Sequence, residues 1–193
     1  MDPLRHMRGQ GGLKSMQYSD RDFPSVYWEA MGATAEFLPG DELPPASEGH
    51  IWAVLVFLFY GDKIVLADIA GRGYCIPSGK VEQGETISVA AEREVFEEVG
   101  GRLKEDALWL IGCYKLTSKS RADRYCAVFV AEALGFEPIP AGSESQGKML
   151  SAIEDVADLY FQWDPLMDAV FAYAEKQRQA LFRDGISLSD FTS

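Results

Sequence analysis

The stretch from Gly79 to Gly101 constrains the fold and the chemistry of this chain more than any other part of it. It reads GKVEQGETISVAAEREVFEEVGG, a glycine-containing loop that leads into a segment of helical period. Glu94, Glu97 and Glu98 stand at i, i+3 and i+4, so a helix would carry three carboxylates on one face. Because like charges at this spacing cost roughly 0.2 to 0.5 kcal/mol per pair, the pattern predicts that a positive group binds there.

The same stretch carries the signals of an amphipathic helix. Thr86 is a predicted N-cap, and Gly100 and Gly101 predict a C-terminal stop. An apolar stripe at i, i+4 spacing lies between them and can pack the helix against a sheet. The stripe consists of Ile87, Ala91, Val95 and Val99. The helix should therefore bury one face and present acids on another.

The fixed positions of this stretch resemble the Nudix box, the signature of the Nudix hydrolase family. These positions are Gly79, Glu85, Arg93, Glu94, Glu97, Glu98 and Gly100. With each residue type at about 7% usage, a chance match to all of them is on the order of 10⁻⁸ per register. Two flanking positions depart from the pattern: Gly101 replaces an aliphatic residue, and Ser78 replaces a common second glycine. Neither departure removes a carboxylate.

The resemblance implies an α/β fold, the Nudix-type α/β/α sandwich with a mixed, curved β-sheet between helices. Apolar runs at 51–60 and 63–68, separated by Gly61-Asp62, predict a hairpin. Residues 108–116 and 125–133 predict two further strands on either side of a polar loop.

Towards the two ends of the chain, the sequence gives fewer signals for secondary structure. A Pro/Gly/Ser loop is predicted at 137–147, and a long helix at about 165–182. Residues 22–38 mix aromatic and small residues without a clean period, so a short helix and an added strand are both open. We divide the chain into an N-terminal tail and connector, 1–49, and a Nudix hydrolase domain with its C-terminal helix, 50–193. The tail could pack on the domain or at a homodimer interface.

The composition limits which partners the protein can bind and in which cellular compartment we expect it. The net charge of −12 disfavours a nucleic-acid partner, because phosphate backbones need clustered Lys and Arg. Three widely spaced cysteines indicate neither a disulfide framework nor a zinc site. No apolar run reaches the 18 or so residues of a membrane span, and no signal peptide is recognisable. We expect a cytoplasmic protein with a small-molecule nucleotide substrate.

By resemblance, the acids of the box hold a divalent cation and take part in catalysis. Glu97 and Glu98 are the implied principal metal ligands, Glu94 either joins them or positions a water, and the Ser78 carbonyl is a further implied ligand. Hard Mg²⁺, or Mn²⁺, prefers such oxygen ligands. The general base comes either from the box or from a later loop, where Glu144 is the candidate.

Other residues of the box have an architectural role in the family. Glu85 and Arg93 are expected to pair and to hold the loop against the helix, and Gly79 and Gly100 are the glycines of the pattern. Without the rest of the match, a solvated acidic face would be the more common explanation of a Glu-rich helix.

Substrate contacts must come from outside the box. Arg72, Lys80 and Arg121 lie in or near loops at the expected open end of the sheet, where they can meet phosphates. Lys115, Lys119 and Arg124 share that region. Tyr74 is a candidate for stacking on a base, as are Trp52 and Tyr60.

The predicted function is a Mg²⁺-dependent Nudix pyrophosphohydrolase. It would cleave a pyrophosphate bond in a nucleoside diphosphate linked to another moiety, with a nucleoside triphosphate as first choice. ADP-ribose, a nucleotide sugar or a dinucleotide is the alternative substrate. A catalytically inactive nucleotide-binding module is the remote alternative, and the complete set of box glutamates argues against it.

Overall fold

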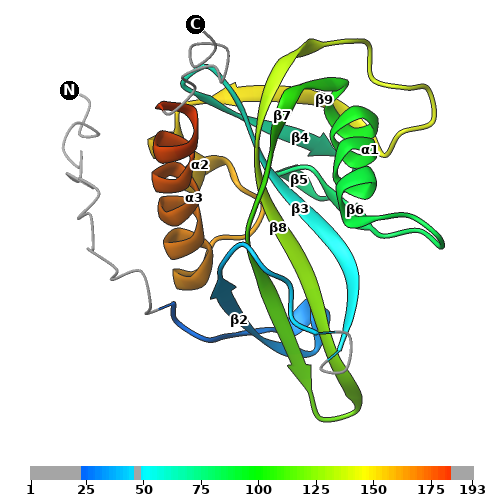
Figure 1. Ribbon diagram of the computed structural model, residues 1–193, viewed down its shortest axis with the longest axis vertical. Coiled ribbons are helices and arrows are strands. Elements are labelled where there is room, and N and C mark those ends of the chain that lie inside the picture. The colour runs from blue at the N-terminus through cyan, green and yellow to red at the C-terminus, as the bar shows by residue number, and fades with distance from the viewer. Residues whose placement is uncertain (1–22, 46–48, 184–193) are drawn as a thin grey trace, which may run out of the picture.

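A computed structural model describes residues 23–45 and 49–183, which form one mixed β-sheet between helices (Figure 1). The strand order is β1-β2-β7-β8-β3-β4-β5, with β6 paired to β3 and β9 paired to β4. The strands are β1 (Val26–Trp28), β2 (Ala33–Pro39), β3 (His50–Tyr60), β4 (Lys63–Ile69), β5 (Gly73–Cys75), β6 (Ser78–Lys80), β7 (Gly101–Ser118), β8 (Arg121–Phe136) and β9 (Ser145–Ser151). The helices are α1 (Ile87–Val99), α2 (Val156–Leu159) and α3 (Pro165–Arg183), with short 3₁₀ turns η1 (Glu29–Met31) and η2 (Ile153–Asp155).

The predicted sandwich fold is confirmed by this arrangement. Strand β3 pairs in parallel with β8 and antiparallel with β4, which makes the sheet mixed. Helix α1 covers one face of the sheet, and α2 and α3 cover the other (Figure 1). The predicted hairpin is also present, since Tyr60 pairs with Lys63 across the turn.

Helix α1 begins and ends where its sequence predicts. The Thr86 hydroxyl oxygen accepts a hydrogen bond from the Val89 backbone N–H at 3.3 Å. Gly100 adopts a left-handed conformation with φ of 66°, and its N–H donates to the Phe96 carbonyl at 2.9 Å. A side chain at Gly100 would also run into the Glu137 carbonyl. The position therefore needs glycine for two reasons, dihedral and space.

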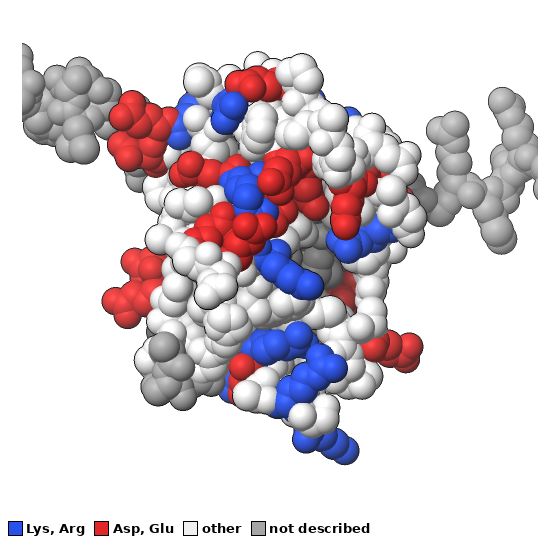
Figure 2. All heavy atoms as spheres, turned by 90° about the vertical axis from the view of Figure 1, so that its right-hand side faces the viewer, with Lys and Arg blue, Asp and Glu red and all other residues white. Residues whose placement is uncertain are grey.

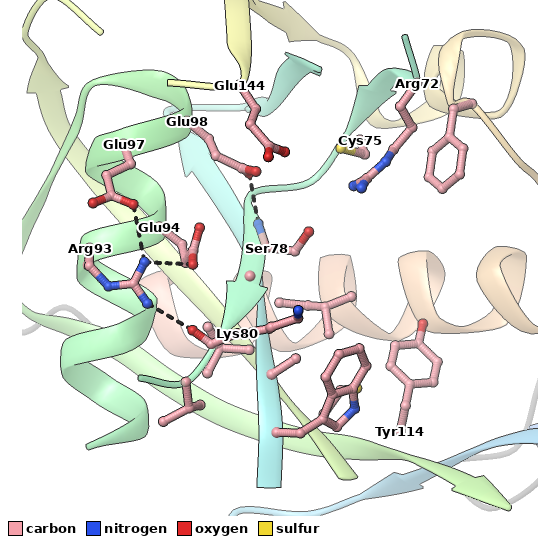
Figure 3. Close-up of a pocket in the computed structure, with 18 of the residues that line it drawn as sticks. Arg72, Cys75, Ser78, Lys80, Arg93, Glu94, Glu97, Glu98, Tyr114 and Glu144 are labelled. Atoms are coloured by element: carbon pink, nitrogen blue, oxygen red, sulfur yellow. Dashed lines mark hydrogen bonds and ion pairs between the residues drawn. The ribbon is translucent and has the colours of Figure 1, made fainter. Parts of the chain in front are cut away.

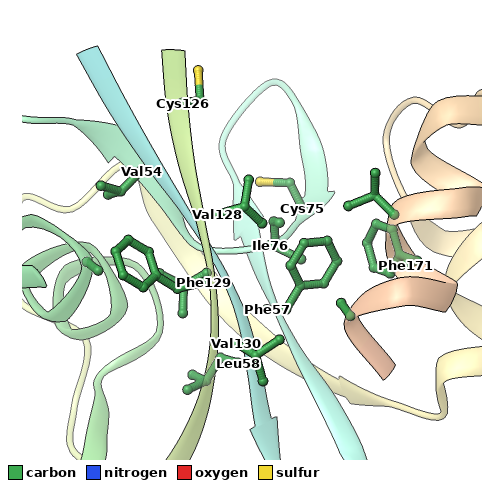
Figure 4. Packing of buried hydrophobic residues seen from close by; sticks show 14 of the residues in the cluster. Val54, Phe57, Leu58, Cys75, Ile76, Cys126, Val128, Phe129, Val130 and Phe171 are labelled. Atoms are coloured by element: carbon green, nitrogen blue, oxygen red, sulfur yellow. The ribbon is translucent and has the colours of Figure 1, made fainter. Parts of the chain in front are cut away.

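Residues from adjacent positions of β3 fill both halves of the core. Phe57 meets Phe171 of α3 edge to face, with ring centroids 4.7 Å apart. Leu58 points to the opposite face, towards α1 (Figure 4), as the alternation of a strand requires. Both side chains are fully buried. This explains why β3 reads as a continuous apolar run and not as an alternating one.

Two predicted loops are wrong in extent. The polar segment 117–124 is mostly strand, because β7 and β8 continue to a tight turn, with Ser118 paired to Arg121. This end of the hairpin is exposed, so its residues can be polar and still form a ladder. The predicted loop at 137–147 ends early, and β9 begins at Ser145. Strand β9 lacks apolar alternation, and its pairing with β4 defines it.

Residues 23–39 add two strands to the sheet ahead of the predicted boundary at residue 49. Strand β2 pairs with β7 from Thr34↔Thr117 to Pro39↔Gly112, and β1 pairs with β2. Ala33, Ala35 and Phe37 are buried on one face of β2. The added strand left open for this segment is therefore present, and η1 supplies a short helical turn. Residues 1–22 of the predicted tail lie outside the described ranges.

None of the helices in the described ranges combines the length and the apolar character that crossing a membrane requires.

Candidate functional site

Glu94, Glu97 and Glu98 lie together on the face of helix α1 that borders strand β6 (Figure 3). Figure 2 shows acidic side chains gathered around basic ones over α1, and a separate basic group at the tip of the β7–β8 hairpin. Glu94 and Glu98 are only 8% and 9% exposed, and Glu97 is half-buried. Figure 3 shows all three on the face of α1 that borders Ser78 and Lys80. The helical spacing therefore does gather the carboxylates predicted from the sequence.

Arg93 is the centre of an ion-pair network on this face. Its Nε and Nη2 atoms donate to the two carboxylate oxygens of Glu85 at 2.9 and 3.0 Å. Its Nη2 also donates to the Lys80 carbonyl at 2.9 Å, which ties the loop of the box to the helix. The pair expected between Glu85 and Arg93 thus exists in the structure.

The same guanidinium also contacts two of the clustered acids. Its Nη1 atom donates to Glu94 at 2.7 Å and to Glu97 at 3.1 Å. Burial raises the pKa of the Glu94 carboxyl, and the bond from Arg93 opposes that rise. Part of the positive charge predicted for this face is therefore supplied by the protein itself.

Glu98 is the most perturbed acid of the cluster. Burial raises its pKa to about 7, and a hydrogen bond from the Ser78 backbone N–H, 2.9 Å from Oε2, opposes the rise. Glu94 and Glu144 add negative charge nearby and raise the pKa further. A desolvated carboxylate surrounded by other acids is stabilised by a bound cation.

Backbone geometry at the start of the box lets the acids approach the loop. A Cβ at Gly79 would overlap the Glu94 carboxylate, so only glycine allows this contact. Ser78 stands where the family commonly has glycine. Among the described residues, Asp106 is the only non-glycine residue with a positive φ, so Ser78 has a negative one. Serine therefore fits this position without backbone strain.

The donor set suits a hard divalent cation, although the side chains are not gathered into a finished cage. Among the residues placed by the structure, no three acidic, histidine or cysteine side chains converge as a metal cluster. The reason is visible in the contacts, because Arg93 holds Glu94 and Glu97 while Glu98 bonds to Ser78. Mg²⁺ needs only one or two carboxylates and keeps several waters, so the arrangement fits it.

A cavity of about 1120 Å³ opens beside the acids. Arg72, Lys80 and Glu144 line it together with the acidic cluster and Ser78. Figure 3 shows Glu144 beside Glu98, and Arg72 reaching in from the opposite side. The Arg72 side chain also lies near Cys75 (Figure 3) and over the Phe161 ring, 5.8 Å from its centroid. Basic and acidic groups thus face each other across one space.

Two predicted substrate contacts are not brought to this cavity. Tyr74 is absent from its lining because β5 pairs with β4 and the Tyr74 ring packs against the core. Arg121 is absent because it stands at the exposed tip of the β7–β8 hairpin. The structure instead adds lining residues that sequence reasoning missed. These include Trp28, Met31, Tyr114, Asp164 and Met167.

The signals for the missed residues were weak, since they come from three distant parts of the chain: the β1–η1 segment, β7 and the start of α3. Only Asp164 had a local signature, an acid directly before the proline that opens α3. Its Oδ1 accepts from the Met167 N–H at 2.9 Å, as an N-cap does.

Comparison with known proteins agrees with the motif and the fold. The model of the NUDIX domain matches residues 49–184. The pyrophosphohydrolase BsRppH of Bacillus subtilis, solved in a mutant form, is 27% identical with a TM-score of 0.62, over 80% of this chain and 93% of that chain. A NUDIX family hydrolase from Clostridium perfringens, 18% identical over 65% of this chain and 96% of that chain, has a TM-score of 0.51 and supports the fold alone. The family resemblance is confirmed.

A curated relative is similar over a shorter stretch. YtkD of Bacillus subtilis (strain 168), whose name gives it provisionally as an 8-oxo-dGTP diphosphatase, is 41% identical over 100 residues. The match covers 52% of this chain and 58% of the relative. The chain thus spans little more than half the length of that relative.

Proposed function

Since this chain belongs to the NUDIX domain family, we propose that it is a Mg²⁺-dependent pyrophosphohydrolase whose substrate is a nucleoside triphosphate. The observation that carries the proposal is the cluster of Glu94, Glu97 and Glu98 at one end of a cavity whose other end is aromatic. A nucleotide has the same two-ended character, anionic phosphates and an aromatic base. The predicted enzyme class also agrees with the names of the two Bacillus subtilis proteins, YtkD and BsRppH.

The metal would be held by Glu97 and Glu98, with Glu94 and the Ser78 carbonyl as further oxygen ligands. Bound there, Mg²⁺ would neutralise charge on the nonbridging phosphate oxygens and promote ionisation of a water. Mn²⁺ has similar ligand preferences and is the alternative ion.

Side chains of the protein would bind the phosphates and supply the general base. Arg72 and Lys80 line the cavity beside the acids and would bind the phosphates through charge-assisted hydrogen bonds. Glu144 lies close enough to Glu98 to raise the pKa of that carboxyl, so it stands where a general base could take the proton of an attacking water. Glu94 is the second candidate base, and its carboxylate accepts a hydrogen bond from Arg93 Nη1 at 2.7 Å.

The substrate of YtkD provides a first choice among nucleotides. We include 8-oxo-dGTP because of the name of that relative, and dGTP as its unmodified counterpart. ADP-ribose, nucleotide sugars and dinucleotides remain the alternative substrates.

The test is a turnover screen with purified protein. Nucleoside triphosphates, 8-oxo-dGTP, ADP-ribose, a nucleotide sugar and a dinucleotide are each incubated with Mg²⁺, and released phosphate and pyrophosphate are measured separately. The proposal expects one of the triphosphates to give the highest kcat/KM and excess chelator to abolish turnover. Turnover that persists in chelator would contradict the metal mechanism, and no turnover of any substrate would favour the inactive binding module.

A further inference from the structure

The aromatic end of the cavity is built partly by residues that precede the matched family domain. The NUDIX match begins at residue 49. Trp28, at the end of β1, and Ala30 and Met31, in η1, nevertheless line the cavity. They reach it because β2 continues the sheet beside β7 and buries Phe37 against Tyr114, with ring centroids 5.3 Å apart.

A hydrogen bond joins this wall to the residue that precedes α3. The indole N–H of Trp28 donates to Asp164 Oδ2 at 2.8 Å, between residues 136 positions apart. The other oxygen of Asp164 caps α3 through Met167. Because the carboxylate is held by the helix, it can fix the orientation of the Trp28 ring. The Trp28 ring is tilted against Tyr114 at a centroid distance of 5.2 Å.

The two ends of the cavity therefore differ in chemistry. The end at α1 carries acids, Arg93 and Lys80, while the other end is lined by Trp28, Met31, Tyr114 and Met167, with the Asp164 carboxylate at its edge. In Figure 3, Lys80 lies between the acids and Tyr114. A flat ring with N–H donors fits the second end, because aromatic faces stack on it and a carboxylate accepts its hydrogen bonds.

We infer that the β1–η1 segment is the base-side wall of the substrate site, and that the bond from Trp28 to Asp164 positions it. Trp28 would stack on the base, and Asp164 would keep the indole in place. Selection of the base then depends on a segment that precedes residues 49–184, the range that the family model matches. This inference takes the class of ligand from the proposed function.

The kinetic test compares a nucleoside triphosphate with inorganic triphosphate, which has no base. Trp28→Ala should raise KM for the nucleoside triphosphate about tenfold, the order expected for one stacked base. It should leave kcat within about threefold and the inorganic triphosphate unaffected, because the metal end stays intact. Trp28→Phe keeps a ring but removes the indole donor, so a smaller rise in KM is expected.

Tyr27→Ala is the matched control. Tyr27 is the neighbouring residue of β1, is 61% exposed and does not line the cavity. Its replacement should leave KM and kcat unchanged for both the nucleoside triphosphate and inorganic triphosphate. If Trp28→Ala lowers activity equally on both substrates, or if Tyr27→Ala has the same effect, then Trp28 has only a structural role and the inference is overturned.

A binding experiment separates this inference from the proposed function. Isothermal calorimetry with dGMP in chelator measures base-side binding without turnover, for wild type, Trp28→Phe and Trp28→Ala. Weaker binding of dGMP by the folded variants supports the inference even if wild type hydrolyses nothing. Equal binding by wild type and variants, or no binding by wild type, overturns it. Circular dichroism spectra and melting curves establish whether each variant is folded. If Trp28→Ala does not fold, the comparison of wild type with Trp28→Phe is used instead.

Discussion

Replacing Glu98 by glutamine should stabilise the protein when no metal is bound. A pKa raised from 4.5 to about 7 means that ionising this carboxyl in the folded protein costs about 3 kcal/mol more than in the unfolded chain, at about 1.4 kcal/mol for each pKa unit. Glutamine has nearly the same shape, carries no charge and can still accept the bond from the Ser78 N–H. At pH 8 in chelator, Glu98→Gln should therefore be more stable by up to about 3 kcal/mol.

The pH dependence has a definite sign. The folded state holds this proton more tightly than the unfolded state, so wild type has its full stability below the unfolded pKa of 4.5. That stability falls as the pH rises through the folded pKa of about 7. The advantage of Glu98→Gln should accordingly be small at pH 4.5, grow between pH 4.5 and 7, and level off above.

Urea denaturation in chelator at a series of pH values measures this difference. Glu92→Gln is the control, because the Glu92 carboxylate lies on the same helix and remains exposed to solvent in the folded protein. Mg²⁺ at about 1,000 times its Kd should reverse the order, since it adds about 4.1 kcal/mol to the form that binds it, more than the carboxylate costs. Equal midpoints for wild type and Glu98→Gln at pH 8 in chelator would refute the reasoning, because the carboxylate would then not be desolvated.

Three further perturbations test other parts of the site. Glu97→Gln should lower kcat by about 100-fold or more with little change in melting temperature, since it removes a proposed metal ligand that is half exposed. A normal kcat in Mg²⁺ would contradict that role. Arg93→Ala should cost about 3 kcal/mol of stability in urea denaturation, because it leaves the partly buried carboxylates around it unpaired, and a loss below about 1 kcal/mol would show that the network is solvated. Gly100→Ala should destabilise more than Gly84→Ala: both positions have positive φ, and only Gly100 also meets a backbone carbonyl, so equal losses would mean that the dihedral alone decides.

Local sequence predicted the elements that are defined by short-range physics. The N-cap at Thr86 and the C-cap at Gly100 need only neighbours along the chain, and both are found. The continuous apolar run of β3 reflects burial on both faces. Where polar residues enter a strand, as in the β7–β8 hairpin, periodicity predicted a loop and was wrong. Cross-strand pairing decides such segments, and pairing is a long-range property.

The acidic face of α1 was determined by the sequence alone, because the spacing of Glu94, Glu97 and Glu98 fixes their common side on any helix. Only the tertiary structure decided how those acids are used. Burial against β6 raises the pKa of Glu98, and Arg93 joins the loop to the helix. The opposite wall of the cavity depends on contacts between residues more than a hundred positions apart, such as Trp28 with Asp164. No spacing along the chain encodes that contact, since it arises only when β2 joins the sheet and α3 packs across it.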